Sequence, residues 1–113
     1  MEQHYKLHRV KELADNDMEF IKALAEAFLG EVPEDAERLK KAVAESDYYN
    51  TYQAAHKMKP TIDLFELGVL EALIVVQDWG KLEKAGEDCS RELELVLAAV
   101  NQASTEIKED FDL

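Results

Sequence analysis

Apolar residues recur at intervals of three and four along almost the whole chain. The most regular series lies between Asp17 and Ser46 and consists of Phe20, Leu24, Phe28, Val32, Ala36, Leu39 and Val43. Clusters of β-branched residues with the period-two alternation of strands are missing, and only 4 Gly and 2 Pro interrupt the 113 residues. The spacing therefore predicts an all-α protein.

Gly30 and Pro33 bear on the length of the first long helix. A proline inside a helix removes one hydrogen bond and crowds the preceding turn, at a cost of about 3 kcal/mol, which favours a break at this point. The apolar series nevertheless keeps its register across both residues. We therefore expect one long helix from Asp17 to Ser46, kinked near Pro33, with Asn16 or Asp17 as its N-cap.

A short helix is predicted before this one, over residues 6–14, and another long helix after it. Ser46 and Asp47 supply a turn and a cap between the two long helices. The apolar series of the second long helix is Tyr48, Thr51, Ala55, Met58, Ile62, Phe65 and Val69. This helix carries His56.

Two further helices complete the predicted fold. One covers Gly68 to about Trp79, after which Gly80 and Gly86 bracket a polar turn. The last helix begins near Glu87, and its apolar series is Cys89, Leu93, Val96, Val100, Ala103, Ile107 and Phe111. Four amphipathic helices joined by short turns predict an antiparallel four-helix bundle, with the short N-terminal helix across one end. Residues 1–113 are expected to form a single domain.

Charge and composition exclude several partners. The chain has 25 Asp and Glu against 13 Lys and Arg, for a net charge of -12, so its averaged field repels nucleic acid and anionic lipid. No apolar run approaches the roughly 18 to 20 residues that span a bilayer. The first six residues lack the basic-then-apolar pattern of a secretion signal, and the single Cys89 cannot form an internal disulfide. These features predict a cytoplasmic protein without nucleic-acid or membrane partners.

His56 is the main candidate for chemistry. At 100° per residue, the apolar series of its helix centres about 130° away from it, so the imidazole is expected to face water. Tyr52 lies one turn before it on the same face, Lys59 and Pro60 one turn after it, and Asp63 two turns after it. An exposed imidazole has an ordinary pKa of about 6.5 and keeps a free lone pair at cytoplasmic pH, with which it can attack phosphorus.

The segment around His56 reads Ala55-His56-Lys57-Met58-Lys59-Pro60-Thr61-Ile62-Asp63-Leu64-Phe65-Glu66. It resembles the Ala-His-x-Leu-Lys-Gly motif of histidine-containing phosphotransfer domains. The acidic, proline-containing stretch from Phe28 to Leu39 is also similar to one that this family often has before its histidine. The resemblance covers roughly Asp17 to Val76 and implies a four-helix bundle.

Site roles follow from this resemblance. It implies that His56 is the phosphoacceptor and that Lys59 steadies the phosphoryl group, with Lys57 adding positive charge and Tyr52 contributing to docking. Pro60 and Glu66 stand where the family has glycine, and Asp63 stands where small residues are usual. An anionic Asp63 is expected to repel a phosphohistidine, and Lys57 and Lys59 to offset that repulsion.

The implied function is a phosphorelay intermediate. His56 would accept a phosphoryl group from the aspartate of one response-regulator receiver domain and pass it to another, with a hybrid histidine kinase starting the relay. The chain would need no cofactor or metal of its own, because the receiver supplies Mg²⁺. No glycine-rich phosphate loop occurs in the sequence, so we expect a monomeric phosphocarrier without autokinase activity, not an enzyme.

Other interpretations of these residues remain open. The alternative function is that of a non-catalytic helical adaptor, which binds receiver domains without carrying phosphate. His4 and His8 have the spacing of metal ligands but no third ligand nearby, and the Glu-x-x-His motifs of di-metal bundles are missing. Cys89 lies on an apolar face, where a buried, unreactive thiol is expected. Tyr48 is expected to pack in the core.

Overall fold

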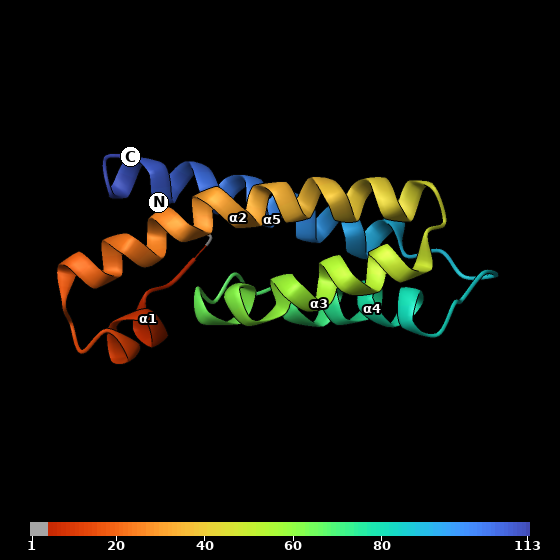
Figure 1. Cartoon of the computed structure of the whole chain (residues 1–113), viewed down its shortest axis with the longest axis horizontal. Helices are drawn as coiled ribbons and strands as arrows, with labels where there is room; N and C mark the ends of the chain where they lie inside the picture. The colour runs from red at the N-terminus through yellow and green to blue at the C-terminus, as the bar shows by residue number, and fades with distance from the viewer. Residues whose placement is uncertain (1–4) are drawn as a thin grey trace.

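The structure is a computed structural model that describes residues 5–113, and within this range it contains helices and no strand. The five helices, in chain order, are α1 (His8–Leu13), α2 (Met18–Ala44), α3 (Tyr48–Leu64), α4 (Leu70–Lys81) and α5 (Ser90–Asp110). Figure 1 shows the four long helices running along the long axis of the molecule, with α1 at one end. The prediction of an all-α protein with a short first helix is confirmed.

Helix α2 runs through Pro33 without a break, as the apolar register predicted. Asp17 is its N-cap, and its carboxylate accepts hydrogen bonds from the backbone N–H groups of Glu19 and Phe20. The predicted phase is wrong at the start of the helix, where Phe20 is 44% exposed and Ile21 is buried instead. The buried face therefore begins one residue later than the sequence pattern suggested.

The long helices contact one another in a closed order. Helix α2 packs against α3 and α5, and α4 packs against the same two helices. The molecule measures 46 × 25 × 20 Å along its principal axes. Each long helix thus has two neighbours, which bury its apolar face.

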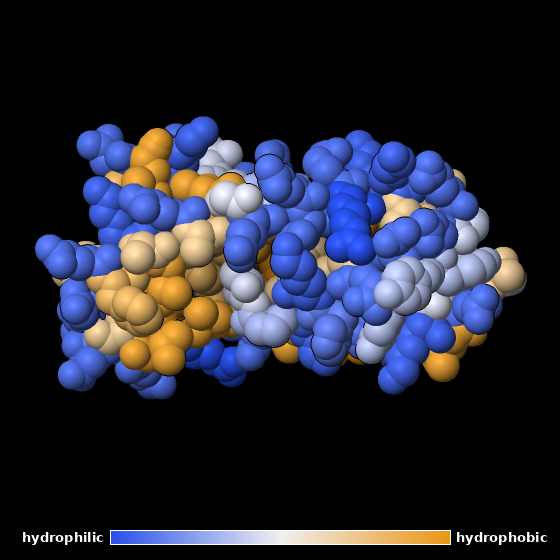
Figure 2. All heavy atoms as spheres, viewed as in Figure 1, coloured by the Kyte–Doolittle hydropathy of each residue, from blue (hydrophilic) through white to orange (hydrophobic). Residues whose placement is uncertain are grey.

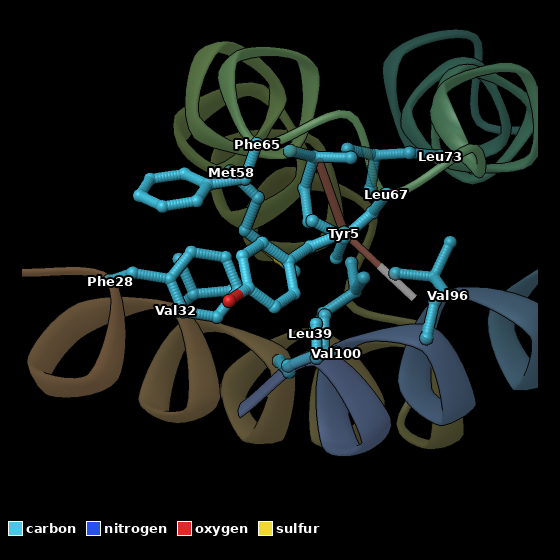
Figure 3. Packing of buried hydrophobic residues seen from close by; sticks show 14 of the residues in the cluster. Tyr5, Phe28, Val32, Leu39, Met58, Phe65, Leu67, Leu73, Val96 and Val100 are labelled. Atoms are coloured by element: carbon cyan, nitrogen blue, oxygen red, sulfur yellow. The ribbon is translucent and has the colours of Figure 1, made fainter. Parts of the chain in front are cut away.

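The core is formed by side chains from all four long helices. Phe28 of α2 and Phe65, just after α3, lie with their ring centroids 5.0 Å apart. Figure 3 shows these rings beside Met58, with Val96 and Val100 of α5 reaching the same cluster. Full burial of such a side chain contributes about 1.5 to 3 kcal/mol. The predicted apolar faces of α3 and α5 are largely confirmed by this packing.

The predicted polar turn after the fourth helix is present, but it begins at Leu82, so Gly80 is the last residue but one of α4 and does not belong to the turn. It is buried inside α4, where its backbone lies directly against α3. A Cβ placed on Gly80 would come within 2.7 Å of the Tyr48 carbonyl oxygen and 2.8 Å of the Tyr52 nitrogen. Glycine is needed here because the two helices approach too closely for any side chain.

Helix α3 ends in a reversal that usually contains glycine. Glu66 adopts a φ of 52°, and its N–H donates to the Asp63 carbonyl while the Leu67 N–H donates to the Ile62 carbonyl. This pair of hydrogen bonds is the Schellman motif, whose left-handed residue is commonly glycine. The position where the phosphotransfer family has its second glycine is therefore a helix-terminating position in this chain.

Tyr5 and Lys6, which precede α1, are bonded to other parts of the molecule. Tyr5 is buried, and its hydroxyl donates to Asp110 Oδ2 at 2.5 Å. The Lys6 N–H donates to the Phe65 carbonyl at 2.8 Å, and Val10 of α1 is fully buried. Burial, followed by the hydrogen bond to Asp110, raises the pKa of Tyr5. These contacts place α1 close to the end of α3.

The surface differs between the two ends of the molecule. Leu13, Met18 and Phe20 are exposed near the junction of α1 and α2, and Figure 2 shows apolar surface gathered at this end of the view. Most of the remaining visible surface is hydrophilic. Within the described part of the chain, none of the helices combines the length and apolar character required to cross a bilayer.

Candidate functional site

His56 lies on the outer face of α3, where its side chain is exposed. Ala55 and Met58 on the same helix are buried, because they fall on the apolar face that packs against α2 and α4. Each residue of an α-helix is rotated by about 100° from the one before it. His56 therefore lies about 100° from Ala55 and on the far side of the helix from Met58. The exposure of His56 therefore agrees with the phase of the helix.

Tyr52 lies one turn before His56 and supports its ring. The two ring centroids are 5.6 Å apart, with an angle of 24° between the ring planes. Residues four apart on a helix are surface neighbours, and a stacked arrangement restricts the rotamers of both rings. Tyr52 therefore orients the imidazole while leaving it open to solvent.

A shallow hollow of about 150 Å³ lies beside His56. It is lined by His56, Lys59, Pro60, Asp63 and Leu70. The structure thus brings together four of the predicted site residues with the first residue of α4. Lys59 forms no ion pair with any residue in the range 5–113, so its ammonium is available to an anion in this hollow.

Pro60 stands inside α3 and on the wall of the hollow. Since proline has no N–H, the His56 carbonyl receives no hydrogen bond from position 60. The helix nevertheless continues to Leu64. Proline here adds a compact apolar surface next to the imidazole and no polar group.

Asp63 is paired with an arginine from a different helix. Arg9 Nη1 of α1 donates to Asp63 Oδ2 at 2.6 Å, and the two side chains are 53% and 45% exposed. The expected repulsion between Asp63 and a phosphoryl group on His56 is thus reduced by a cation that lies 54 residues away in sequence. Sequence spacing alone gives no signal for this pair.

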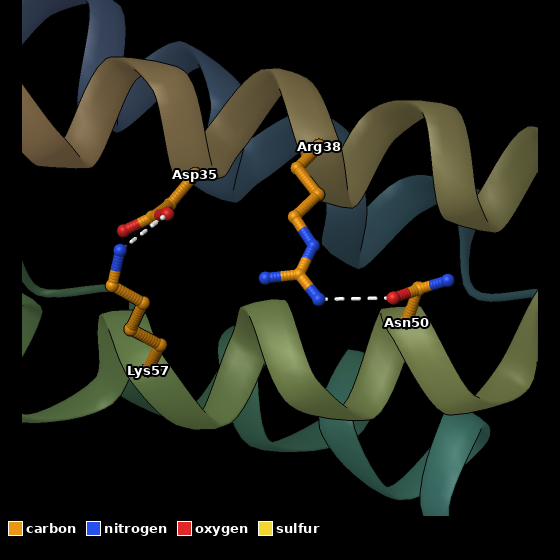
Figure 4. Close-up of polar contacts among 4 residues, drawn as sticks. All are labelled: Asp35, Arg38, Asn50 and Lys57. Atoms are coloured by element: carbon orange, nitrogen blue, oxygen red, sulfur yellow. Dashed lines mark hydrogen bonds and ion pairs between the residues drawn. The ribbon is translucent and has the colours of Figure 1, made fainter.

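Lys57 points away from the hollow and toward α2. Its Nζ donates to Asp35 Oδ1 at 3.0 Å, and the Asp35 side chain is only 10% exposed. Figure 4 shows this ion pair bridging α2 and α3. The charge of Lys57 therefore compensates a largely buried carboxylate, and Lys57 contributes less to the positive charge at the hollow than the sequence suggested.

A second polar bridge joins α2 and α3 nearer the start of α3. The Arg38 guanidinium donates to Asn50 Oδ1 at 2.9 Å (Figure 4). Asn50 in turn donates from its backbone and side chain to the carboxylate of Asp47, the N-cap of α3. The side-chain bond and then the backbone bond hold the pKa of Asp47 below its ordinary value. The predicted cap at Asp47 is confirmed.

The remaining candidate residues lie apart from this hollow. Tyr48 packs against Trp79 with ring centroids 4.8 Å apart. Cys89 is buried, and desolvation raises its pKa, which disfavours the reactive thiolate. His8 is exposed on α1, and His4 lies outside the described residues. Nowhere in the range 5–113 do three or more His, Cys, Asp or Glu side chains gather as metal ligands.

Sequence reasoning missed Arg9 and Leu70. Leu70 reaches the hollow through the packing of α4 against α3, and Arg9 reaches Asp63 through their ion pair. Neither residue lies at a helical spacing from His56. Asp35 was also missed as the partner of Lys57, although an acidic residue on the buried face of α2 was a visible signal. The site therefore consists of a predicted strip on α3 and unpredicted neighbours from other helices.

The arrangement provides a nucleophile and a cation on one exposed surface. The imidazole nitrogen can attack an electrophile that a partner presents, and Lys59 can stabilise negative charge next to it. The hollow is too open to exclude water, so any reaction there depends on a partner to complete the site. No protein-family model, curated protein or solved structure shows a significant match to the chain.

Proposed function

We propose that the chain is a histidine phosphotransfer domain that carries a phosphoryl group on His56 between receiver domains. The observation that carries this proposal is the exposed imidazole of His56 beside one hollow with the ammonium of Lys59, which has no ion-pair partner among residues 5–113. A surface histidine without function does not need an orienting aromatic neighbour or an adjacent unpaired cation. Both are present here.

The helix packing supports the same proposal at the level of the fold. Contacts join α2 to α3, α3 to α4, α4 to α5 and α5 to α2, which is the neighbour order of a four-helix bundle. Short connections between successive helices favour antiparallel directions. We infer an antiparallel four-helix bundle that presents α3, and with it His56, to a partner.

The reaction would be an in-line displacement at phosphorus. The lone pair of a neutral imidazole nitrogen forms the N–P bond, and the P–O bond of the receiver's acyl phosphate breaks. The electron pair of that bond returns to the receiver aspartate as a carboxylate, while the other imidazole nitrogen keeps its proton. Reversal of these changes returns the phosphoryl group to a second receiver. Lys59 stabilises the phosphoryl oxygens in both directions.

The partner would supply what this chain lacks. A receiver domain provides the aspartyl phosphate, the bound Mg²⁺ and the acidic pocket into which His56 inserts. An acidic receiver pocket attracts the local positive charge of Lys59, whereas the chain as a whole, with its net charge of -12, repels it. The charge distribution thus favours docking through the surface that contains His56, in a cytoplasmic monomer.

Transfer from a charged receiver tests the proposal directly. We expect the wild-type chain to acquire radiolabelled phosphate from receivers charged by acetyl phosphate or by a hybrid kinase. The label should be lost in acid and retained in alkali, as expected for a phosphoramidate, and peptide mapping should place it on α3. If no receiver from the same genome transfers label, yet some of them bind the chain, the protein is an adaptor.

Lys59→Ala is expected to slow transfer about tenfold, since it removes the charge that stabilises the phosphoryl group at a partly solvated site. The melting temperature should change little, because Lys59 is off the apolar face. Lys41→Ala is the matched control: Lys41 lines a different hollow with Asp47 and Asn50, so its transfer rate should equal that of wild type. Equal rates for the two variants would remove Lys59 from the site.

A further inference from the structure

The ion pair between Arg9 and Asp63 raises the question of why α1 supplies a cation at this place. Both side chains are about half exposed, and exposed pairs of this kind add little to stability. The pair is therefore poorly explained as a stabilising contact. Its position is more informative, because Asp63 lines the same hollow as His56 and Lys59.

Asp63 has a second potential partner on its own helix. Lys59 precedes it by four residues, and oppositely charged side chains at this spacing meet on a helix surface. In the structure, however, Asp63 is bonded to Arg9, and Lys59 is unpaired among the described residues. Arg9 therefore competes with Lys59 for the same carboxylate, and Arg9 holds it.

The backbone that carries Arg9 is fixed relative to α3. Val10, the next residue, is fully buried, and the Lys6 N–H is bonded to the Phe65 carbonyl just after α3. Arginine also offers several N–H donors to a carboxylate, whereas lysine is a point charge. The geometry thus gives Arg9 the advantage in the competition for Asp63.

We propose that Arg9 is a positioning residue of the phosphotransfer site: by holding Asp63, it leaves Lys59 free to contact the phosphoryl group on His56. This inference rests on the proposed function and assigns a part in it to α1. Without Arg9, Asp63 would pair with Lys59 and would also turn its negative charge toward the phosphoryl group. Both changes oppose transfer.

Arg9→Gln tests the inference through its interaction with Asp63→Asn. We expect Arg9→Gln to slow transfer from a charged receiver about three- to fivefold at low ionic strength. The double variant Arg9→Gln/Asp63→Asn should recover the wild-type rate, and Arg9→Lys, which keeps the charge but loses the additional donors, should lie between Arg9→Gln and wild type. At 1 M salt the defect should become smaller, since the Debye length falls to about 3 Å. A defect that Asp63→Asn does not correct would indicate a merely structural role and overturn the inference.

A second measurement needs no receiver. Limited acetylation with acetic anhydride, read by mass spectrometry, should modify Lys59 about two- to threefold less in Arg9→Gln than in wild type, because an ion-paired amine reacts more slowly. Lys22, exposed on α2, is the internal standard. Unchanged Lys59 reactivity would overturn the inference.

The two experiments distinguish failure of the inference from failure of the proposed function. Absence of phosphate label on the wild-type chain would count against the proposed function, and acetylation would still decide whether Arg9 controls the reactivity of Lys59.

Discussion

Replacement of His56 by glutamine is expected to reduce receiver-dependent labelling by more than about a hundredfold, because it removes the only proposed nucleophile. Glutamine keeps a polar side chain of similar size on the exposed face of α3. The free energy of unfolding should therefore change by less than about 0.5 kcal/mol, as for most surface substitutions. Rates of label incorporation and thermal melts, measured on the same preparations, check both expectations.

His8→Gln is the matched control for this variant. His8 is also exposed, but it lies at the start of α1 and does not line the hollow. Its label incorporation should equal that of wild type. Labelling that persists in His56→Gln, or that is lost in His8→Gln, would contradict the assignment of the phosphoacceptor.

Gly80→Ala is expected to lower the free energy of unfolding by at least ~2 kcal/mol. The added methyl group would lie under 3 Å from two backbone atoms of α3, and backbone atoms of a packed helix cannot move aside as a side-chain end can. The clash outweighs the gain of about 1 kcal/mol that alanine gives over glycine in a helix. For a domain of this size the melting temperature should fall by roughly 10 °C.

Gly30→Ala provides the opposite expectation in the same chain. Gly30 is exposed within α2, and a Cβ at this position meets nothing within 4 Å. Alanine should therefore stabilise the protein by up to about 1 kcal/mol through helix propensity. If Gly80→Ala melted at or above the temperature of Gly30→Ala, the close approach of α3 and α4 would be wrong.

The periodicity of apolar residues was sufficient to predict the helices, including the continuation of α2 through Pro33. Propensity and periodicity act within one helix, so they identified most of its buried face, although at the start of α2 Ile21 is buried in place of Phe20. They gave a wrong interpretation of Gly80, because a glycine near a helix end looks the same whether it ends the helix or admits a neighbouring backbone. Only the packing of α3 on α4 distinguishes the two cases.

For the candidate site, as for the fold, the sequence predicted what lies within one helix and not the contacts between helices. His56, Lys59 and Asp63 share one face of α3, and their spacing alone predicted this. The partners of Asp63 and Lys57 come from α1 and α2, and no local spacing encodes a contact between distant segments. The charge environment of the hollow therefore required the structure, although the residues that line it on α3 did not.

The bridges from α2 to Lys57 and Asn50 have a consequence for recognition. Lys57 and Asn50 lie almost two turns apart on α3, so two anchors resist any roll of that helix about its own axis. A partner that docks on α3 would therefore meet an imidazole whose direction around the helix axis is already fixed. It would lose little conformational entropy in ordering the surface, and brief encounters would then suffice for the transfer that we propose.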